Sequence, residues 1–170
     1  MKKSILIILI SVFSLSSMIA QTEKPKLYHP EADAKADIAK AISKAKAEGK
    51  HVLLQIGGNW CSWCIAFDKK VKETESLRTL LNENYIAYHL NYSRENYNED
   101  ILADLDYPQR FGFPVFVVLD SNGKRLHTQN SVYLEEGKGH NEKKILEFFK
   151  HWSPVAVDAK SYPSRKRTKK

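Results

Sequence analysis

Two cysteines could carry the chemistry of this chain. Cys61 and Cys64 are the only cysteines among 170 residues, and their spacing is C-x-x-C. Two thiols can exchange reversibly with a disulfide, because one thiolate attacks it and the second sulfur resolves the mixed disulfide that forms. Residues three apart on a helix share one face, so Cys64 would lie within reach of a mixed disulfide on Cys61. The spacing therefore indicates redox chemistry.

Three other uses of the pair compete with that one. A structural disulfide is possible, although a ring with two intervening residues restrains the unfolded chain little. A zinc site would need two further ligands, and the histidines lack H-x(3–5)-H spacing. Haem attachment requires histidine where Ile65 stands. We favour redox activity, with a structural disulfide and then a metal site as alternatives, and we predict no cofactor and assign no metal ligand.

The segments around the pair should hold it at a strand-to-helix junction. Residues 51–56 form an almost continuously apolar run, which favours a strand buried on both faces, as at the centre of a sheet. Residues 65–82 have a helical pattern with a break predicted near 73–76. Cys61 would then lie at a helix N-terminus, where free N–H groups and the helix dipole stabilise a thiolate.

The remaining pattern predicts alternating helices and strands. Pro114 precedes an apolar run, which suits the first position of a strand because proline has no N–H to donate. Asp120–Gly123 is a hairpin turn signal. We expect helices at 31–48, 99–105 and 141–152 and strands at 85–91, 115–119 and 125–129.

The N-terminus has the pattern of a signal peptide. Lys2 and Lys3 precede an apolar stretch, and Ala20 ends a run of small residues at a plausible cleavage point. An uncleaved membrane anchor is the alternative, but the run from 4 to 20 is shorter than the ~20 apolar residues of a spanning helix. We predict a signal peptide at 1–20 and an exported, periplasmic or extracellular protein in an oxidising compartment.

Charge is concentrated at the two ends of the chain. The net charge is +7, yet residues 21–159 hold 19 Lys and Arg against 20 Asp and Glu. The high pI therefore gives no support for nucleic-acid binding by the folded part. We expect a linker at 21–30, one domain at 31–152 and a basic, disordered tail at 153–170.

The cysteine motif and the later proline together resemble one family. Trp60-Cys61-Ser62-Trp63-Cys64 after the first strand, and Phe113-Pro114 before a later one, resemble the thioredoxin superfamily, most closely the exported thioredoxin-like proteins of bacteria. The resemblance covers about residues 31–152. It implies an α/β thioredoxin fold, with a mixed four-to-five-stranded sheet flanked by helices on both faces.

The resemblance also implies roles for single residues. Cys61 is similar to the family's exposed nucleophile and Cys64 to its buried resolving cysteine. Trp60, Phe113 and Pro114 are expected to contact substrate, with Pro114 matching the cis-proline that faces the disulfide. Trp60 and Phe113 could equally be packing residues.

Two positions depart from the family pattern. Gln55 stands where many thioredoxins hold a buried aspartate that helps to move the proton of the resolving thiol, and an amide cannot titrate. We expect Gln55 to be a buried, hydrogen-bonded amide. Ser62-Trp63 replaces the Gly-Pro of cytoplasmic thioredoxins, so Trp63 and Gln55 form the immediate surroundings of the pair, and the direction of electron flow stays unassigned.

These patterns predict a thiol:disulfide oxidoreductase that uses Cys61 and Cys64. Its expected partners are the thiols and disulfides of exported proteins, together with an upstream thiol-disulfide electron donor or acceptor. We expect a monomer without nucleic-acid partners. The alternative function is a thioredoxin-fold module that binds proteins without turnover.

Overall fold

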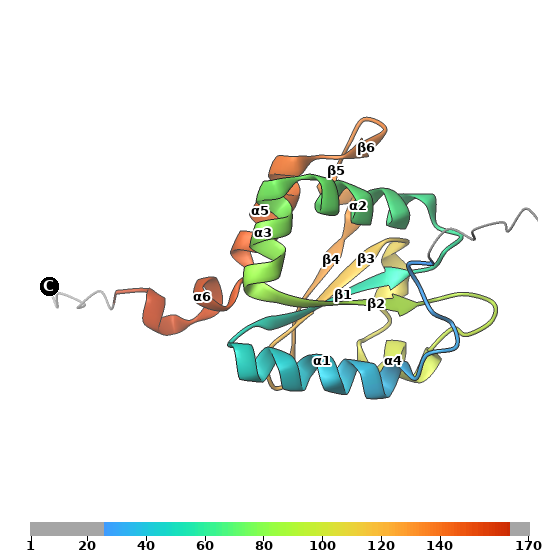
Figure 1. The fold of residues 1–170 in the computed structure, drawn as a ribbon, viewed down its shortest axis with the longest axis horizontal. Helices are drawn as coiled ribbons and strands as arrows, with labels where there is room; N and C mark the ends of the chain where they lie inside the picture. The colour runs from blue at the N-terminus through green and yellow to red at the C-terminus, as the bar shows by residue number, and fades with distance from the viewer. Residues whose placement is uncertain (1–25, 164–170) are drawn as a thin grey trace, which may run out of the picture.

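A four-stranded mixed sheet forms the centre of the computed structural model, which describes residues 26–163 (Figure 1). The strand order is β2-β1-β3-β4. β1 (His51–Gly57) runs parallel to β2 (Tyr85–Asn91) and antiparallel to β3 (Val115–Leu119), and β3 pairs antiparallel with β4 (Arg125–Asn130). Every residue of β1 and β3 is buried, which confirms the prediction of a central, doubly covered strand.

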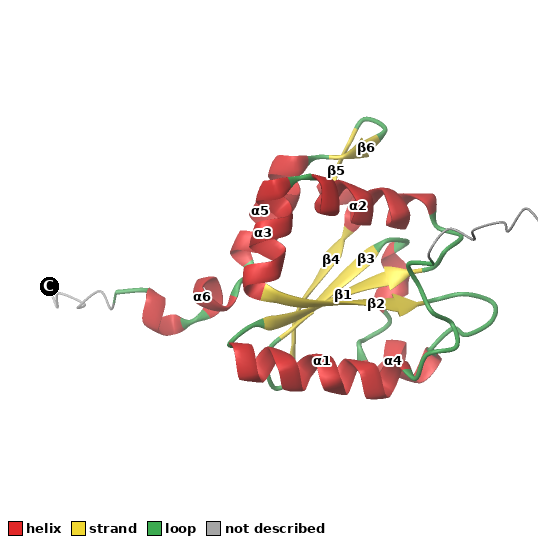
Figure 2. Cartoon of the chain, viewed as in Figure 1, coloured by secondary structure: helices red, strands yellow, loops and turns green. Residues whose placement is uncertain are grey.

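Helices cover both faces of this sheet, as predicted (Figure 2). On one face, α1 (Ala34–Glu48) and the short α4 (Glu99–Asp104) pack on side chains of β1 and β3. The apolar stripe of α1 supplies Ala41 and Ala45, and α4 supplies Leu102. The sequence favoured a start at residue 31, but the helix begins at Ala34 because the Asp33 side chain accepts a hydrogen bond from Ala36 N–H at 3.0 Å.

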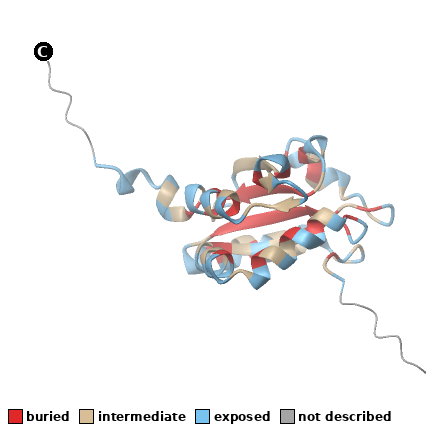
Figure 3. Ribbon diagram, turned by 90° about the horizontal axis from the view of Figure 1, so that it is seen from above, coloured by how far each residue is buried: buried red, intermediate tan, exposed pale blue. Residues whose placement is uncertain are grey.

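Three helices cover the opposite face. These are α2 (Ser62–Glu73), α3 (Glu75–Asn84) and α5 (Glu142–His151). The predicted break between the first two lies at Thr74, which has extended backbone angles. Phe67 of α2 and Phe149 of α5 pack with Phe116 of the sheet in the second core cluster. The buried strands lie between the two helical layers (Figure 3), and β1 leads from this core directly into the segment before α2.

The stretch from 130 to 140 contains more structure than the loop expected there. A 3₁₀ turn at Ser131–Leu134 leads into a two-stranded hairpin, β5 (Glu135–Glu136) and β6 (Gly139–His140). The main sheet therefore keeps four strands, and this hairpin packs against α2.

Both ends of the described chain are more ordered than the sequence indicated. Residues 26–30 belong to the segment expected to be a linker, yet Tyr28 is completely buried. The expected disordered tail begins with α6 (Pro154–Val157) and a 3₁₀ turn at Ala159–Ser161, because Ser153 and Asp158 cap these turns with their side chains. The predicted signal peptide and the last basic residues lie outside the described residues. Within 26–163, the helices fall short of the length and apolarity needed to span a membrane.

Candidate active site

Cys61 and Cys64 form a disulfide at the start of α2. The Cα atoms are 5.3 Å apart and the S–S bond measures 2.06 Å. Cys61 is the N-cap of α2, and its Sγ accepts a hydrogen bond from the backbone N–H of Cys64 at 3.1 Å. The sulfur of Cys61 therefore faces the positive end of the helix dipole, where a negative charge is stabilised.

The two cysteines differ only slightly in exposure. Cys64 is completely buried, as expected for a resolving cysteine, whereas Cys61 exposes 5% of its surface. The expectation of an openly exposed Cys61 is therefore wrong for the disulfide form. Leu27, Trp63 and Phe113 pack around the pair and leave Cys61 only a small opening to solvent.

Gln55 is a buried, hydrogen-bonded amide, as the sequence predicted. Its Nε2 donates to the backbone carbonyl of Cys64 at 3.0 Å and to the hydroxyl of Tyr28 at 2.9 Å. Gln55 lies in the middle of β1, nine residues before Cys64, and the strand aims it under the first turn of α2. The uncharged amide of Gln55 is thus hydrogen-bonded to the backbone of Cys64.

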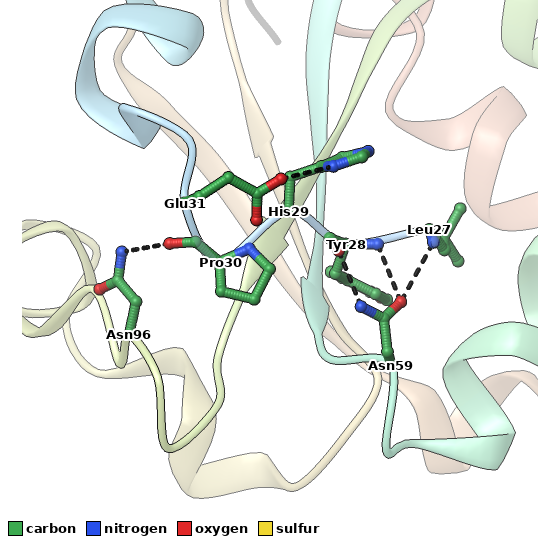
Figure 4. A network of polar contacts seen from close by, with 7 residues as sticks. All are labelled: Leu27, Tyr28, His29, Pro30, Glu31, Asn59 and Asn96. Carbon is green, nitrogen blue, oxygen red and sulfur yellow. Dashed lines mark hydrogen bonds and ion pairs between the residues drawn. The ribbon is translucent and has the colours of Figure 1, made fainter. Parts of the chain in front are cut away.

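Tyr28 is the site residue that sequence reasoning missed. Its side chain is entirely buried and packs in one cluster with Cys61 and Cys64. The Asn59 side chain fixes it there: Oδ1 accepts from the N–H groups of Leu27 and Tyr28 at 3.1 Å, and Nδ2 donates to the Tyr28 carbonyl at 2.7 Å (Figure 4). Only the aromatic character of a tyrosine in a polar, proline-flanked stretch could have marked it beforehand.

His89 and Asp68 lie near the Tyr28 ring. The ring meets His89 of β2 edge-on, with centroids 5.5 Å apart, and His89 Nε2 lies 3.4 Å from the Asp68 carboxylate. Lys72 also contacts Asp68, at 2.8 Å. Partial burial of Asp68 opposes its ionisation, but the hydrogen bonds from His89 and Lys72 outweigh burial and lower the pKa of this carboxyl below its ordinary value.

Aromatic side chains form the rim beside the disulfide. Trp60 is 58% exposed, its indole N–H donates to the Tyr92 carbonyl at 2.8 Å, and its ring meets Phe113 edge-on at 5.4 Å. The Tyr92 ring stacks on Phe113, with ring centroids 4.8 Å apart, and packs against Tyr97, with centroids 5.0 Å apart. Trp60, Tyr92 and Tyr97 line a hollow of about 550 Å³ together with Ser93, Arg94 and Glu95.

Pro114 and Trp63 occupy different surroundings. The Phe113–Pro114 peptide bond is cis, and Pro114 is buried directly before β3. Trp63 is half-buried and meets the ring of His140 in the β5–β6 hairpin edge-on at 5.2 Å. Burial lowers the pKa of His140, although the charge of Glu135 opposes that shift. Trp63 thus links α2 to the hairpin, whereas Phe113 belongs to the aromatic rim.

Comparison with known proteins agrees with this fold. The model of the Thioredoxin-like family matches residues 33–121, more than half of the chain. The chain therefore belongs to the Thioredoxin-like family, and it has a disulfide oxidoreductase fold with a C-x-x-C pair.

Solved structures share the arrangement over most of their length. A disulphide isomerase from Xylella fastidiosa is 27% identical, with a TM-score of 0.64 over 72% of this chain and 93% of that protein. The oxidised C-terminal domain of DsbD from Neisseria meningitidis is 17% identical, with a TM-score of 0.51 over 71% of this chain and 97% of that domain. The second likeness concerns the fold alone.

Among curated proteins the likeness is restricted to one segment. Spermatogenesis-associated protein 20 of Mus musculus is 38% identical over 47 residues, which are 28% of this chain and 6% of the mouse protein. The chain therefore matches only a small part of that relative.

Proposed function

We propose that this protein catalyses thiol:disulfide exchange between its Cys61–Cys64 pair and the thiols or disulfides of exported proteins. The observation that carries the proposal is the position of Cys61: its sulfur caps α2 and already accepts the N–H of Cys64. That N–H and the helix dipole would stabilise the negative charge that Cys61 must hold to act as a nucleophile.

The exchange would run in two steps. In the reduced protein, the Cys61 thiolate attacks one sulfur of a substrate disulfide, and the other substrate sulfur leaves with the electron pair and takes a proton from water. Cys64 then gives its proton to water and attacks Sγ of Cys61, which restores the Cys61–Cys64 disulfide and releases the second substrate thiolate. The reverse sequence oxidises a substrate dithiol, and an upstream thiol-disulfide partner would regenerate the starting state.

The aromatic rim would hold the substrate. Trp60 supplies exposed apolar surface, and the half-buried Phe113 packs between it and the cysteines. The backbone next to Pro114 would pair with an extended substrate segment as an added strand. Trp63 and Gln55 would position the cysteines without contacting the substrate. Trp63 would fix the first turn of α2 through His140, and Gln55 would fix the backbone of Cys64. Export rests on the leader pattern at 1–20, and cell fractionation with an antibody against the chain tests it.

Reduction of insulin by dithiothreitol tests the activity. The protein should accelerate it, and both Cys61→Ser and Cys64→Ser should abolish the acceleration. A module that only binds proteins would give the same slow rate as no protein at all, and that result would reject catalysis.

Trapping of mixed disulfides tests the assignment of roles. Cys64→Ser should accumulate mixed disulfides with exported proteins because the resolving thiol is missing, whereas Cys61→Ser should not. Equal trapping by the two variants would contradict Cys61 as the nucleophile.

A further inference from the structure

The buried hydroxyl of Tyr28 has a hydrogen that the disulfide form does not use. The group of Gln55 that faces the Cys64 carbonyl must be its NH₂, because a carbonyl only accepts. The same NH₂ lies 2.9 Å from Tyr28 Oη, so this oxygen is the acceptor there. Among the hydrogen bonds described for residues 26–163, the Tyr28 hydroxyl donates none. A buried O–H without an acceptor lowers the stability of the folded protein. A hydrogen-bond acceptor that forms beside it later would remove that cost.

The sulfur of Cys64 and this hydroxyl lie on the same side of Gly57. A methyl group placed on Gly57 would overlap Sγ of Cys64 and lie 3.0 Å from Tyr28 Oη. Both atoms therefore border the same small space over the end of β1, inside the cluster that Tyr28 forms with the two cysteines. Tyr28 and Cys64 are both completely buried in the disulfide form.

We propose that Tyr28 donates a hydrogen bond to Sγ of Cys64 whenever that sulfur is a thiolate, and so supports the resolving step. This inference rests on the proposed function, because only an exchanging pair needs Cys64 as a thiolate. Tyr28 is a donor and not a base. The proton of Cys64 passes to water or to the departing substrate thiolate, the new S–S bond joins Cys61 and Cys64, and the bond between Cys61 and substrate breaks.

The surroundings keep Tyr28 in the protonated form that the role requires. Burial raises the pKa of Tyr28 far above its ordinary value; the hydrogen bond from Gln55 opposes this shift, and the charge of Asp68 adds to it. Gln55 also polarises the hydroxyl, since a donor on its oxygen strengthens its own donation. His89 contacts the Tyr28 ring, and Asp68 pairs with both His89 and Lys72; none of these three residues is altered in the comparison below.

The pKa of Cys64 tests the inference directly. In Cys61→Ser the only cysteine is Cys64, so the NMR shift of a ¹³C label on cysteine Cβ follows its ionisation without any need for turnover. Adding Tyr28→Phe keeps the ring and removes the hydroxyl. The pKa of Cys64 should rise by about one unit, a tenfold smaller thiolate fraction at neutral pH, as expected for the loss of a hydrogen bond to a charged group.

Tyr85→Phe is the matched control. Tyr85 is also buried, at 3% exposure, and its hydroxyl donates to the Phe149 carbonyl at 2.7 Å. Both residues belong to the second core cluster, apart from the cysteines. Its loss should lower stability and leave the pKa of Cys64 unchanged. An unchanged pKa in Tyr28→Phe, or the same rise in both variants, would overturn the inference.

Single-turnover kinetics separate this inference from the proposed function. Mixed with a coloured aromatic disulfide, the reduced protein should release a first thiol as Cys61 attacks and a second as Cys64 resolves. Tyr28→Phe should slow the second release about tenfold at neutral pH and leave the first unchanged. If neither release occurs in the wild type, the proposed function fails, while the NMR titration still decides the role of Tyr28.

A second substitution guards against a fold that does not tolerate Tyr28→Phe. Gln55→Met retains Tyr28 but removes the N–H that holds and polarises its hydroxyl. It should raise the pKa of Cys64 in the same direction by less than Tyr28→Phe is expected to. A fall in that pKa, or no change, would count against the inference.

Discussion

Asn59 and Tyr28 form a reciprocal pair of hydrogen bonds across 31 positions of sequence. The Tyr28 N–H donates to Asn59 Oδ1 at 3.1 Å, and Asn59 Nδ2 donates to the Tyr28 carbonyl at 2.7 Å. The side-chain amide thereby acts like the edge of a neighbouring strand. It ties the segment before α1 to the loop just before the cysteines, and it places the Tyr28 ring under the disulfide.

Asn59→Ala should release this segment. Three hydrogen bonds would be lost. Each contributes roughly 0.5–1.5 kcal/mol to stability, and because all three use one side chain their contributions are not fully additive. We therefore expect the free energy of unfolding to fall by about 1–3 kcal/mol. Urea denaturation measures the change. Asn82→Ala, at an exposed position of α3, is the control and should leave stability nearly unchanged. Equal behaviour of the two variants would refute the anchoring role of Asn59.

Gly57→Ala should disturb the site from the strand side. A Cβ at Gly57 would overlap Sγ of Cys64, which is held in the core and cannot move away easily. We expect a loss of about 1–3 kcal/mol in stability and slower closure of the disulfide. Gly139→Ala provides the control because its Cβ would meet no heavy atom within 4 Å. Thermal unfolding of the oxidised proteins compares them, and a fully stable Gly57→Ala would mean that Cys64 has room to shift.

Trp60→Ala should weaken the binding of protein substrates but not of small disulfides. Trp60 is the most exposed member of the aromatic rim, yet its ring supports Phe113. Loss of a large aromatic contact should weaken the binding free energy of insulin by about 1 kcal/mol or more, which raises KM several-fold. The exchange rate with oxidised glutathione should change little. Tyr133→Ala, at 72% exposure, is the control on a different element. An equal loss with both substrates would indicate that Trp60 serves the cysteines themselves.

Asp68→Asn should change how stability depends on pH. The pKa of Asp68 is lowered in the folded protein from its ordinary value of 3.8, so the carboxylate contributes stability above that pH, and the contribution is lost as pH falls through the lower folded pKa. Urea unfolding at neutral pH should find Asp68→Asn less stable than the wild type, and the difference should vanish in strong acid.

The matched control for this titration is Asp104→Asn. Asp104 is exposed at the end of α4 and lies outside the ion pairs described for residues 26–163. Its substitution should give a wild-type profile. A difference between Asp68→Asn and the wild type that persists unchanged into strong acid would show that packing, and not the charge of Asp68, is responsible.

The sequence determined the features that depend on near neighbours. Alternating and continuous apolar runs predicted β2 and β3 with their observed bounds, and the two apolar stripes after Cys64 predicted the break that lies at Thr74. Asp120 makes the predicted hairpin turn by accepting the N–H groups of Asn122 and Lys124. Cys61 at the start of α2 follows from the same local logic, since caps and turns are set by residues a few positions apart.

The tertiary structure decided which distant residues meet at the disulfide. Tyr28 reaches Gln55 over 27 positions, and the ring of His140 reaches Trp63 from a hairpin that no sequence pattern marked. Periodicity shows which face of an element is buried, but it does not show which partner covers that face. The polar stretch before α1 looks like a linker because the side chains that hold it lie far away in sequence. Asn59 is 31 positions from Tyr28 and Gln55 is 27, and these contacts exist only after the sheet and helices have brought the segments together.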